Sequence, residues 1–114
     1  MPTLKIQTNA RIDAPVAEAL IQRASTEIAS LLGKPERYVM VIVEPVIAMS
    51  FGGETAPTAY LELKSLGLDE ARTPEFSTAL CTLMEVSIGV PQDRVYIEFS
   101  APPRHMFGFD GGTF

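Results

Sequence analysis

The sequence predicts a two-layer α/β domain, in which two helices cover one face of a four-stranded mixed sheet. Two observations lead to this fold class: each half of the chain has the pattern strand, helix, strand, and the halves share residues at a constant offset of 56 positions. The shared residues are Gly33, Pro35, Val39 and Val41, which recur as Gly89, Pro91, Val95 and Ile97. Such an offset indicates an internal duplication, with repeats at about residues 2–45 and 58–102. A length of 114 residues allows a single domain, residues 1–114.

The first half opens with apolar Leu4 and Ile6 alternating with Lys5 and Gln7, which predicts a strand at residues 4–8. Apolar residues then recur at three- and four-residue spacing over residues 16–32, which predicts a helix. Asp13 and Pro15 mark its start, and Gly33 and Pro35 mark its end. The continuous apolar, β-branched run at residues 38–43 predicts a strand that is buried on both faces.

The second half repeats this order. Alternation over residues 60–64 predicts another strand, and Thr73-Pro74-Glu75 predicts a helix start with Thr73 as the cap. The helical stripe continues to residue 88, and a last strand follows at residues 95–99. Because a crossover helix allows the strands on either side of it to run parallel, each half forms a β–α–β unit.

This architecture leaves apolar surface without cover inside one chain. Two helices cover one sheet face only, and Phe107, Phe109 and Phe114 lie in a glycine-rich tail with no helix to bury them. Exposed apolar surface of this kind predicts an oligomer.

Composition excludes several classes of function. Nine basic and fourteen acidic residues give a net charge of −5 and argue against a general nucleic-acid-binding protein. One cysteine and one histidine exclude a disulfide framework and a multi-thiolate or histidine-rich metal site, so no metal is expected. No apolar run approaches the length of a membrane span, and the N-terminus lacks the pattern of a signal peptide. We therefore expect a soluble, cytoplasmic protein.

Pro2 and Lys34 each have a structural and a chemical interpretation. Removal of Met1 would leave Pro2 with a secondary amine, whose pKa desolvation or a nearby cation would lower, and such an amine can act as a general base. Alternatively, Pro2 merely begins a strand. Lys34 follows the first helix, where a cation complements the helix dipole; the chemical alternative is anion binding.

The other reactive residue types carry no clear signal. Cys81 falls within the second predicted helix and is expected to be a buried apolar thiol. His105 has no second histidine or cysteine near it and is expected in an exposed loop. The two Gly-Gly pairs lack the residues of a phosphate-binding loop.

Taken in order, several segments resemble the macrophage migration inhibitory factor family of the tautomerase superfamily. The segments are Met1-Pro2, Thr8-Asn9, Gly33-Lys34-Pro35 with Tyr38, Met49 to Gly53, Pro57, Ser65-Leu66-Gly67, Pro91 to Ile97, Gly108-Phe109 and Thr113-Phe114. The resemblance extends over nearly the whole chain, and the duplication matches the two β–α–β units of the family.

The resemblance implies a homotrimer that catalyses keto–enol tautomerisation of aryl pyruvates such as phenylpyruvate, and of dopachrome-like compounds, without a cofactor. By position, Pro2 would be the catalytic base, Lys34 would hold the substrate, and Tyr96 would enter from the neighbouring subunit. The N–H of Leu66, beside Ser65, would donate a further hydrogen bond. The aromatic wall of the pocket would consist of Tyr38, Phe107, Phe109 and Phe114.

Three departures from the family pattern bear on function. Glu98 stands where the family often has asparagine; if ionised near Pro2 it would raise the pKa of the amine, unless it pairs with a lysine or arginine. Thr58 and Leu61 replace the Cys-x-x-Cys of the vertebrate cytokine, so thiol–disulfide chemistry is not expected. Val46 replaces an acidic residue that helps receptor binding.

Two hypotheses from different classes follow, besides a trimeric scaffold for an unrelated ligand. The first is a tautomerase that uses Pro2; it requires the loss of Met1, because an amide nitrogen has no basicity. The second is a cytokine-like extracellular binding or signalling protein with a vestigial pocket, exported without a signal peptide. The Val46 substitution lowers the expectation of receptor binding.

Overall fold

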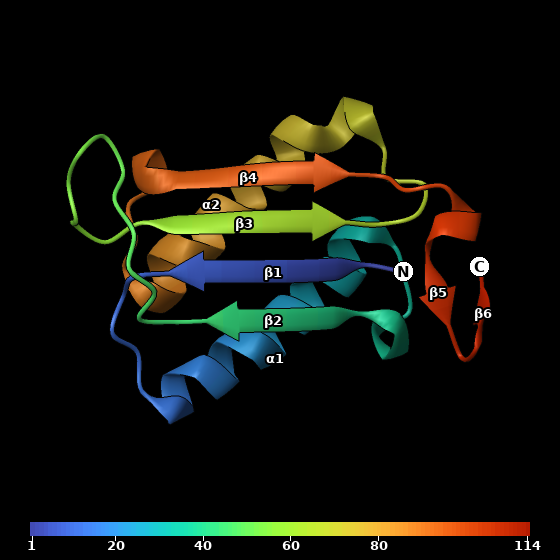
Figure 1. Ribbon diagram of the computed structural model, residues 1–114, viewed down its shortest axis with the longest axis horizontal. Helices are drawn as coiled ribbons and strands as arrows, with labels where there is room; N and C mark the ends of the chain where they lie inside the picture. Colours follow the sequence, from blue (N-terminus) through green and yellow to red (C-terminus); the bar gives the residue numbers. More distant parts are fainter.

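The computed structural model describes residues 1–114 and contains one four-stranded sheet with two helices packed on one face (Figure 1). The sheet has the strand order β2-β1-β3-β4. β1 runs parallel to β2, β3 runs parallel to β4, and the two pairs meet antiparallel between β1 and β3. The main elements are β1 (Thr3–Thr8), α1 (Ala14–Leu32), β2 (Met40–Glu44), β3 (Ala59–Lys64), α2 (Thr73–Ile88) and β4 (Val95–Ser100). The predicted fold class is therefore confirmed.

The chain ends in a small hairpin at one end of the sheet, formed by β5 (Gly108–Phe109) and β6 (Gly112–Thr113) (Figure 1). Neither of the two long helices is apolar enough over a sufficient length to cross a membrane.

The limits of α1 follow from its capping residues. The Asp13 carboxylate accepts a hydrogen bond from Val16 N–H at 3.0 Å, and Pro15 occupies the first turn, where no N–H donor is needed. Gly33 ends the helix with a left-handed φ of 63°, a conformation that costs glycine little.

The start of α2 differs from the prediction. Thr73 is not the N-cap, because a 3₁₀ turn at Glu70–Arg72 leads directly into the helix. Instead of accepting a backbone N–H, the Thr73 hydroxyl donates to the Glu70 carbonyl at 3.0 Å. The Asp69 carboxylate caps the 3₁₀ turn by accepting from Ala71 N–H.

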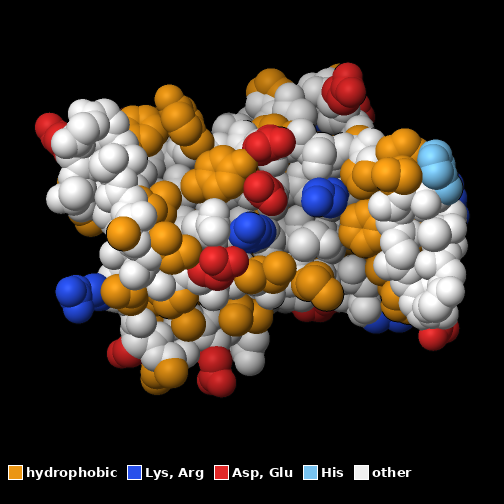
Figure 2. Space-filling view, viewed as in Figure 1, with side chains coloured by type: hydrophobic (Ala, Val, Ile, Leu, Met, Phe, Trp, Pro, Cys, Tyr) orange, Lys and Arg blue, Asp and Glu red, His pale blue; other side chains and the backbone are white.

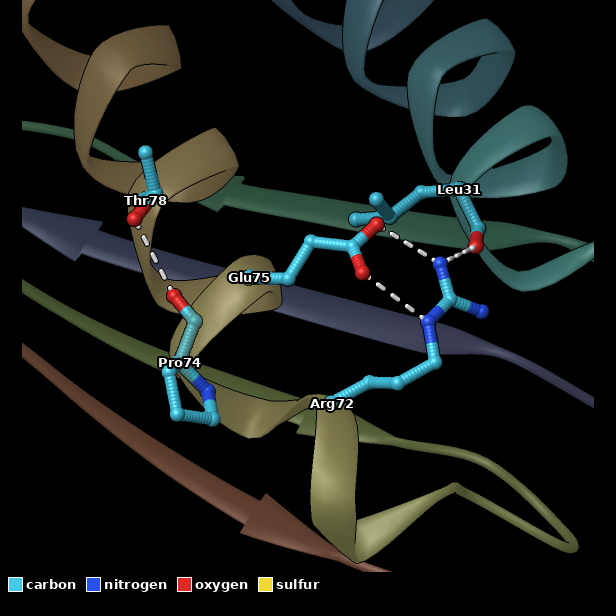
Figure 3. A network of polar contacts seen from close by, with 5 residues as sticks. All are labelled: Leu31, Arg72, Pro74, Glu75 and Thr78. Carbon is cyan, nitrogen blue, oxygen red and sulfur yellow. Dashed lines mark hydrogen bonds and ion pairs between the residues drawn. The ribbon is translucent and has the colours of Figure 1, made fainter.

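Arg72 connects the end of α1 to the start of α2 (Figure 3). Its Nη2 donates to the Leu31 carbonyl at 3.2 Å, and its guanidinium binds both carboxylate oxygens of Glu75 at 2.7 and 3.0 Å. The guanidinium carbon lies 5.0 Å from the centroid of the Phe76 ring. The first turn of α2 is thereby held beside the last turn of α1, from which Lys34 emerges.

The core lies between the helices and the two central strands. Leu4 and Ile6 of β1 and Leu61 and Leu63 of β3 are completely buried on the helix-covered face. The helical partners in the same cluster are Leu20, Ala24, Ile28, Phe76, Leu80, Leu83 and Met84. Cys81 is buried and has no disulfide partner.

The prediction that residues 38–43 are buried on both faces is wrong for one chain. β2 is an edge strand, and Val41 and Val43 pack against the core while Met40 and Ile42 are 59% and 36% exposed on the other face. We call this uncovered side of the sheet the open face. Figure 2 shows it with charged side chains lying over the strands.

Candidate functional site

Pro2 is buried directly before β1, at the end of the sheet where β1 begins and β3 ends; we call this end of the sheet the N-terminal edge. Its carbonyl accepts a hydrogen bond from Met40 N–H of β2 at 3.0 Å. The next residue, Thr3, pairs with Met40 on one side and with Lys64 of β3 on the other. The sheet therefore places the N-terminus between two neighbouring strands, close to the loop that follows α1 and leads into β2.

The environment of the N-terminus favours a neutral amine. The pKa of the Met1 ammonium lies below its ordinary value because partial burial disfavours the charged form, and because Lys34 and Arg104 add positive charge nearby. The chain contains two ion pairs, Arg23–Glu27 and Arg72–Glu75, and neither involves these cations. Lys34 and Arg104 thus present unpaired charge to the N-terminal edge.

Ser65 and Leu66 follow the end of β3 on the same edge and are buried. Ser65 lies with Lys34 against a small cavity of about 50 Å³. Ser65 N–H is already bonded to the Ser100 carbonyl, whereas Leu66 N–H makes no hydrogen bond within the chain. Leu66 N–H is thus a free backbone donor on this edge.

Four predicted aromatic residues meet in one cluster. The rings of Phe109 and Phe114 stack with centroids 5.3 Å apart. Tyr38 meets Phe109 edge-on at 6.0 Å, and Phe107 meets Phe114 at 6.0 Å. The C-terminal hairpin and its flanking residues supply three of these rings. The glycine-rich tail, for which the sequence offered no covering helix, therefore packs its rings against one another and forms one side of the N-terminal edge.

A hollow of about 350 Å³ lies beside this cluster. The residues that line it are Thr3, Lys64, Pro102, Met106, Phe107 and Gly108. Since Thr3 follows Pro2 directly, the hollow opens next to the N-terminus.

Tyr96 and Glu98 do not belong to this cluster within one chain. Tyr96 is 65% exposed, and its register partner Tyr60 lies opposite Gln7, five residues along β1 from Pro2. Five strand residues span about 17 Å. A chain therefore cannot bring Tyr96 to its own Pro2.

Glu98 pairs with a tyrosine hydroxyl rather than with a lysine or arginine. Tyr60 Oη donates to Glu98 Oε2 at 2.8 Å and lies 3.2 Å from Glu62 Oε1. The hydrogen bond to Glu98, together with desolvation and the charges of both carboxylates, raises the pKa of Tyr60 to about 12. The phenol is consequently protonated, and acts as a donor, throughout the neutral range.

Sequence reasoning assigned no role to Arg94, Lys64 or Arg104. Arg94 donates hydrogen bonds to four backbone carbonyls of the loop before β3. Its guanidinium carbon lies 5.3 Å from the centroid of the Phe51 ring, and the Phe51 and Tyr96 ring centroids are 4.8 Å apart. Lys64 lines the hollow, and Arg104 acts on the N-terminus. The only signal for these two residues was their position: Lys64 ends a strand, and Arg104 follows one. Hydrogen bonds to backbone carbonyls, as Arg94 makes, leave no sequence pattern.

A duplicated β–α–β domain of this size, with an aromatic-lined edge at its N-terminus, has the fold of the tautomerase superfamily. The model of the macrophage migration inhibitory factor (MIF) family matches residues 1–114, and the chain belongs to this family. It is 35% identical over 115 residues to a macrophage migration inhibitory factor homolog from Brugia malayi, with 100% of this chain and 99% of the relative covered.

Solved structures show the same fold. The crystal structure of a macrophage migration inhibitory factor homologue from Prochlorococcus marinus superimposes with a TM-score of 0.93 at 42% identity, covering 98% of each chain. The factor from Trichinella spiralis gives a TM-score of 0.90 at 30% identity, covering 98% of this chain and 99% of the other. Membership in this family supports tautomerase or cytokine-like function in general, and proteins of the family are typically oligomeric.

Proposed function

We propose that the protein is a cofactor-independent keto–enol tautomerase of aryl pyruvates such as phenylpyruvate, with Pro2 as its base once Met1 has been removed. The observation that carries this proposal is the environment of the N-terminus. Burial and the unpaired cations Lys34 and Arg104 lower the pKa of an amine at this place. A base is most effective when its pKa lies near the working pH.

The residues at the edge suit the reaction step by step. The Lys34 ammonium would bind the carboxylate of the 2-oxo acid, and Leu66 N–H would donate to its carbonyl oxygen. The Pro2 amine would take the enol hydroxyl proton and deliver a proton to the adjacent carbon, so that the enol becomes the ketone and the amine is neutral again. The aromatic cluster of Tyr38, Phe107, Phe109 and Phe114 offers the apolar wall that a phenyl ring needs.

We further propose that the active unit is a homotrimer. The separation of Tyr96 from Pro2 along the sheet supports this proposal, in which a neighbouring subunit would supply Tyr96 and Glu98 to the site. A neighbouring subunit would also cover the exposed apolar side chains of Met40 and Ile42 on β2.

Replacing the secondary amine of Pro2 by the primary amine of glycine tests the proposal. The intact mass should first show that Met1 is absent from the purified protein. Phenylpyruvate turnover is then compared between wild type, Pro2→Gly and Pro15→Gly, the last being a control at an exposed position in the first turn of α1. We expect Pro2→Gly to lose about 100-fold or more in kcat/KM, and Pro15→Gly to retain its activity. Equal rates for wild type and Pro2→Gly would show that the secondary amine of Pro2 is not required for turnover and would contradict the proposal.

The cytokine-like alternative depends on a receptor rather than on the amine. Position 46, where the vertebrate cytokine offers an acidic residue, is an exposed valine here. Robust turnover together with failure to bind a mammalian receptor at micromolar concentration would remove this alternative.

A further inference from the structure

The hollow beside the N-terminus combines an apolar wall with one charged group. Met106 and Phe107 supply apolar surface, Lys64 supplies an ammonium, and no acidic side chain lines the hollow. Its volume of about 350 Å³ falls in the range of small-molecule sites.

Lys64 has no counter-ion within the chain. It is the last residue of β3 and faces the uncharged residues Thr3 and Ser100 across the sheet. It takes part in neither of the two ion pairs. Lys5 lies on the same open face, but unlike Lys64 it has an acidic residue opposite it, because its register partner on β3 is Glu62.

Within one chain, this edge therefore carries more positive charge than one carboxylate requires. The Glu98 carboxylate that a neighbouring subunit would bring is already held by the Tyr60 hydroxyl of its own chain at 2.8 Å. Lys34 and Arg104 act on the N-terminus, and Lys64 lines the adjoining hollow, although the whole chain has a net charge of −5. Lys34 approaches the N-terminal edge from the loop that follows α1, whereas Lys64 approaches it from β3. Two separate cations on either side of a base suit a substrate with two separate anionic groups.

We infer that the site is built for dianionic aryl pyruvates, in which a second acidic group on the ring binds Lys64. This inference rests on the proposed tautomerase function. The 2-oxo acid carboxylate would bind Lys34, and the ring would lie against the aromatic cluster where Phe107 adjoins Met106 in the hollow. The ring substituent would then reach the Lys64 ammonium. Phenylpyruvate fills the same space without engaging Lys64.

The test uses two substrates that differ by one carboxylate, phenylpyruvate and 4-carboxyphenylpyruvate. At low ionic strength we expect wild type to prefer the carboxylated substrate by about two- to fivefold in kcat/KM, mostly through KM, as one solvent-accessible ion pair permits. Lys64→Met should abolish the preference and leave phenylpyruvate turnover nearly unchanged. Lys5→Met, the matched control on the same face, should keep the preference. Equal kcat/KM values for the two substrates in wild type, or equal losses for both in Lys64→Met, would overturn the inference.

A binding measurement separates this inference from the proposed catalytic function. Cinnamate and 4-carboxycinnamate have no enolisable carbon, and their dissociation constants can be measured by calorimetry on wild type and Lys64→Met. Tighter binding of 4-carboxycinnamate that disappears in Lys64→Met supports the inference even if Pro2→Gly turns out to be as active as wild type. Equal binding of the two ligands by wild type contradicts it even if Pro2 proves to be the base.

Discussion

Arg94 fastens the loop before β3 to the start of β4, and its loss should destabilise the fold. Its Nε donates to the Pro57 carbonyl at 2.9 Å and its Nη2 donates to the Ala56 carbonyl at 3.1 Å. Two longer bonds reach Glu54 at 3.3 Å and Phe51 at 3.4 Å. Arg94→Met keeps most of the aliphatic stem and removes every donor.

The expected loss follows from these bonds. The two shorter bonds from a charged donor contribute about 1 kcal/mol each after solvent exchange, and the longer bonds with the cation–π contact to Phe51 add about 0.5 kcal/mol. The free energy of unfolding should therefore fall by about 2–3 kcal/mol. Denaturant unfolding at one fixed protein concentration measures this loss. Phe51 should also lose its fixed position against Tyr96, so phenylpyruvate turnover should decrease.

Arg72→Met is the matched control. Arg72 also binds a carbonyl and stacks on an aromatic ring, but its main partner is the Glu75 carboxylate, which is 56% exposed and screened by water. Its removal should cost clearly less than the removal of Arg94. A loss in Arg94→Met that is no larger than the loss in Arg72→Met would refute the argument that the carbonyl bonds hold the loop.

Other measurements test separate features of the structure. The phenol of Tyr60 should titrate near pH 12 in wild type, and Glu98→Gln should bring its pKa back toward 10, as followed by ultraviolet titration against Tyr60→Phe. The pKa of Tyr60 is higher in the folded chain than in the unfolded chain, so the hydrogen bond of its phenol stabilises the fold fully below about pH 10, and this stabilisation is lost as the pH rises through 12. An unchanged titration of Tyr60 in Glu98→Gln would contradict the hydrogen bond. Val46 has a φ of 60° and is 55% exposed, so Val46→Asn should raise the free energy of unfolding by about 1 kcal/mol, and a decrease would argue against backbone strain. Lys34→Met removes a positive charge and should raise the pKa of the N-terminal amine, which is measured from the pH dependence of its labelling by an amine reagent; a lower pKa would contradict the assigned cause. Sedimentation should give a mass of about three chains of 12.4 kDa each, and the mass of one chain would exclude the trimer.

The fold could be predicted because its main signals are local and repeated. Alternation in β1 and β3, and capping by Asp13 and Gly33 around α1, each depend on residues close together in sequence. The duplicated Gly and Pro positions then fixed the order of elements. Thr73 was misinterpreted as a cap because the 3₁₀ turn before it has no hydrophobic period to reveal it. The apolar run at residues 38–43 was misinterpreted because a continuous apolar run does not show whether its strand lies in the middle or at the edge of the sheet, and β2 is an edge strand.

The candidate site could be predicted only in part. Positions along one chain indicated Pro2, Lys34 and the aromatic residues, and the fold gathers these at one edge. The hydrogen bond from Tyr60 to Glu98 was not predicted, because it joins neighbouring strands whose register is set by the whole sheet. Lys64 looked like an ordinary solvent-facing residue of an alternating strand. Its lack of a counter-ion becomes visible only when the facing residues of β1 and β4 are known.

Glu98 is the departure from the family pattern that most directly opposes the proposed chemistry, and the structure limits its effect. A carboxylate near an amine stabilises the charged form and raises the amine pKa. Tyr60 is protonated in the neutral range and holds Glu98 by a 2.8 Å hydrogen bond on the open face, so this carboxylate is directed toward β3 of its own chain. At the Met1 ammonium, one residue before Pro2, desolvation and two cations, Lys34 and Arg104, act in the opposite direction. Glu98 should therefore raise the pKa of the N-terminal amine by less than desolvation, Lys34 and Arg104 together lower it. We expect Glu98 to adjust the basicity of the amine without abolishing its function as a base.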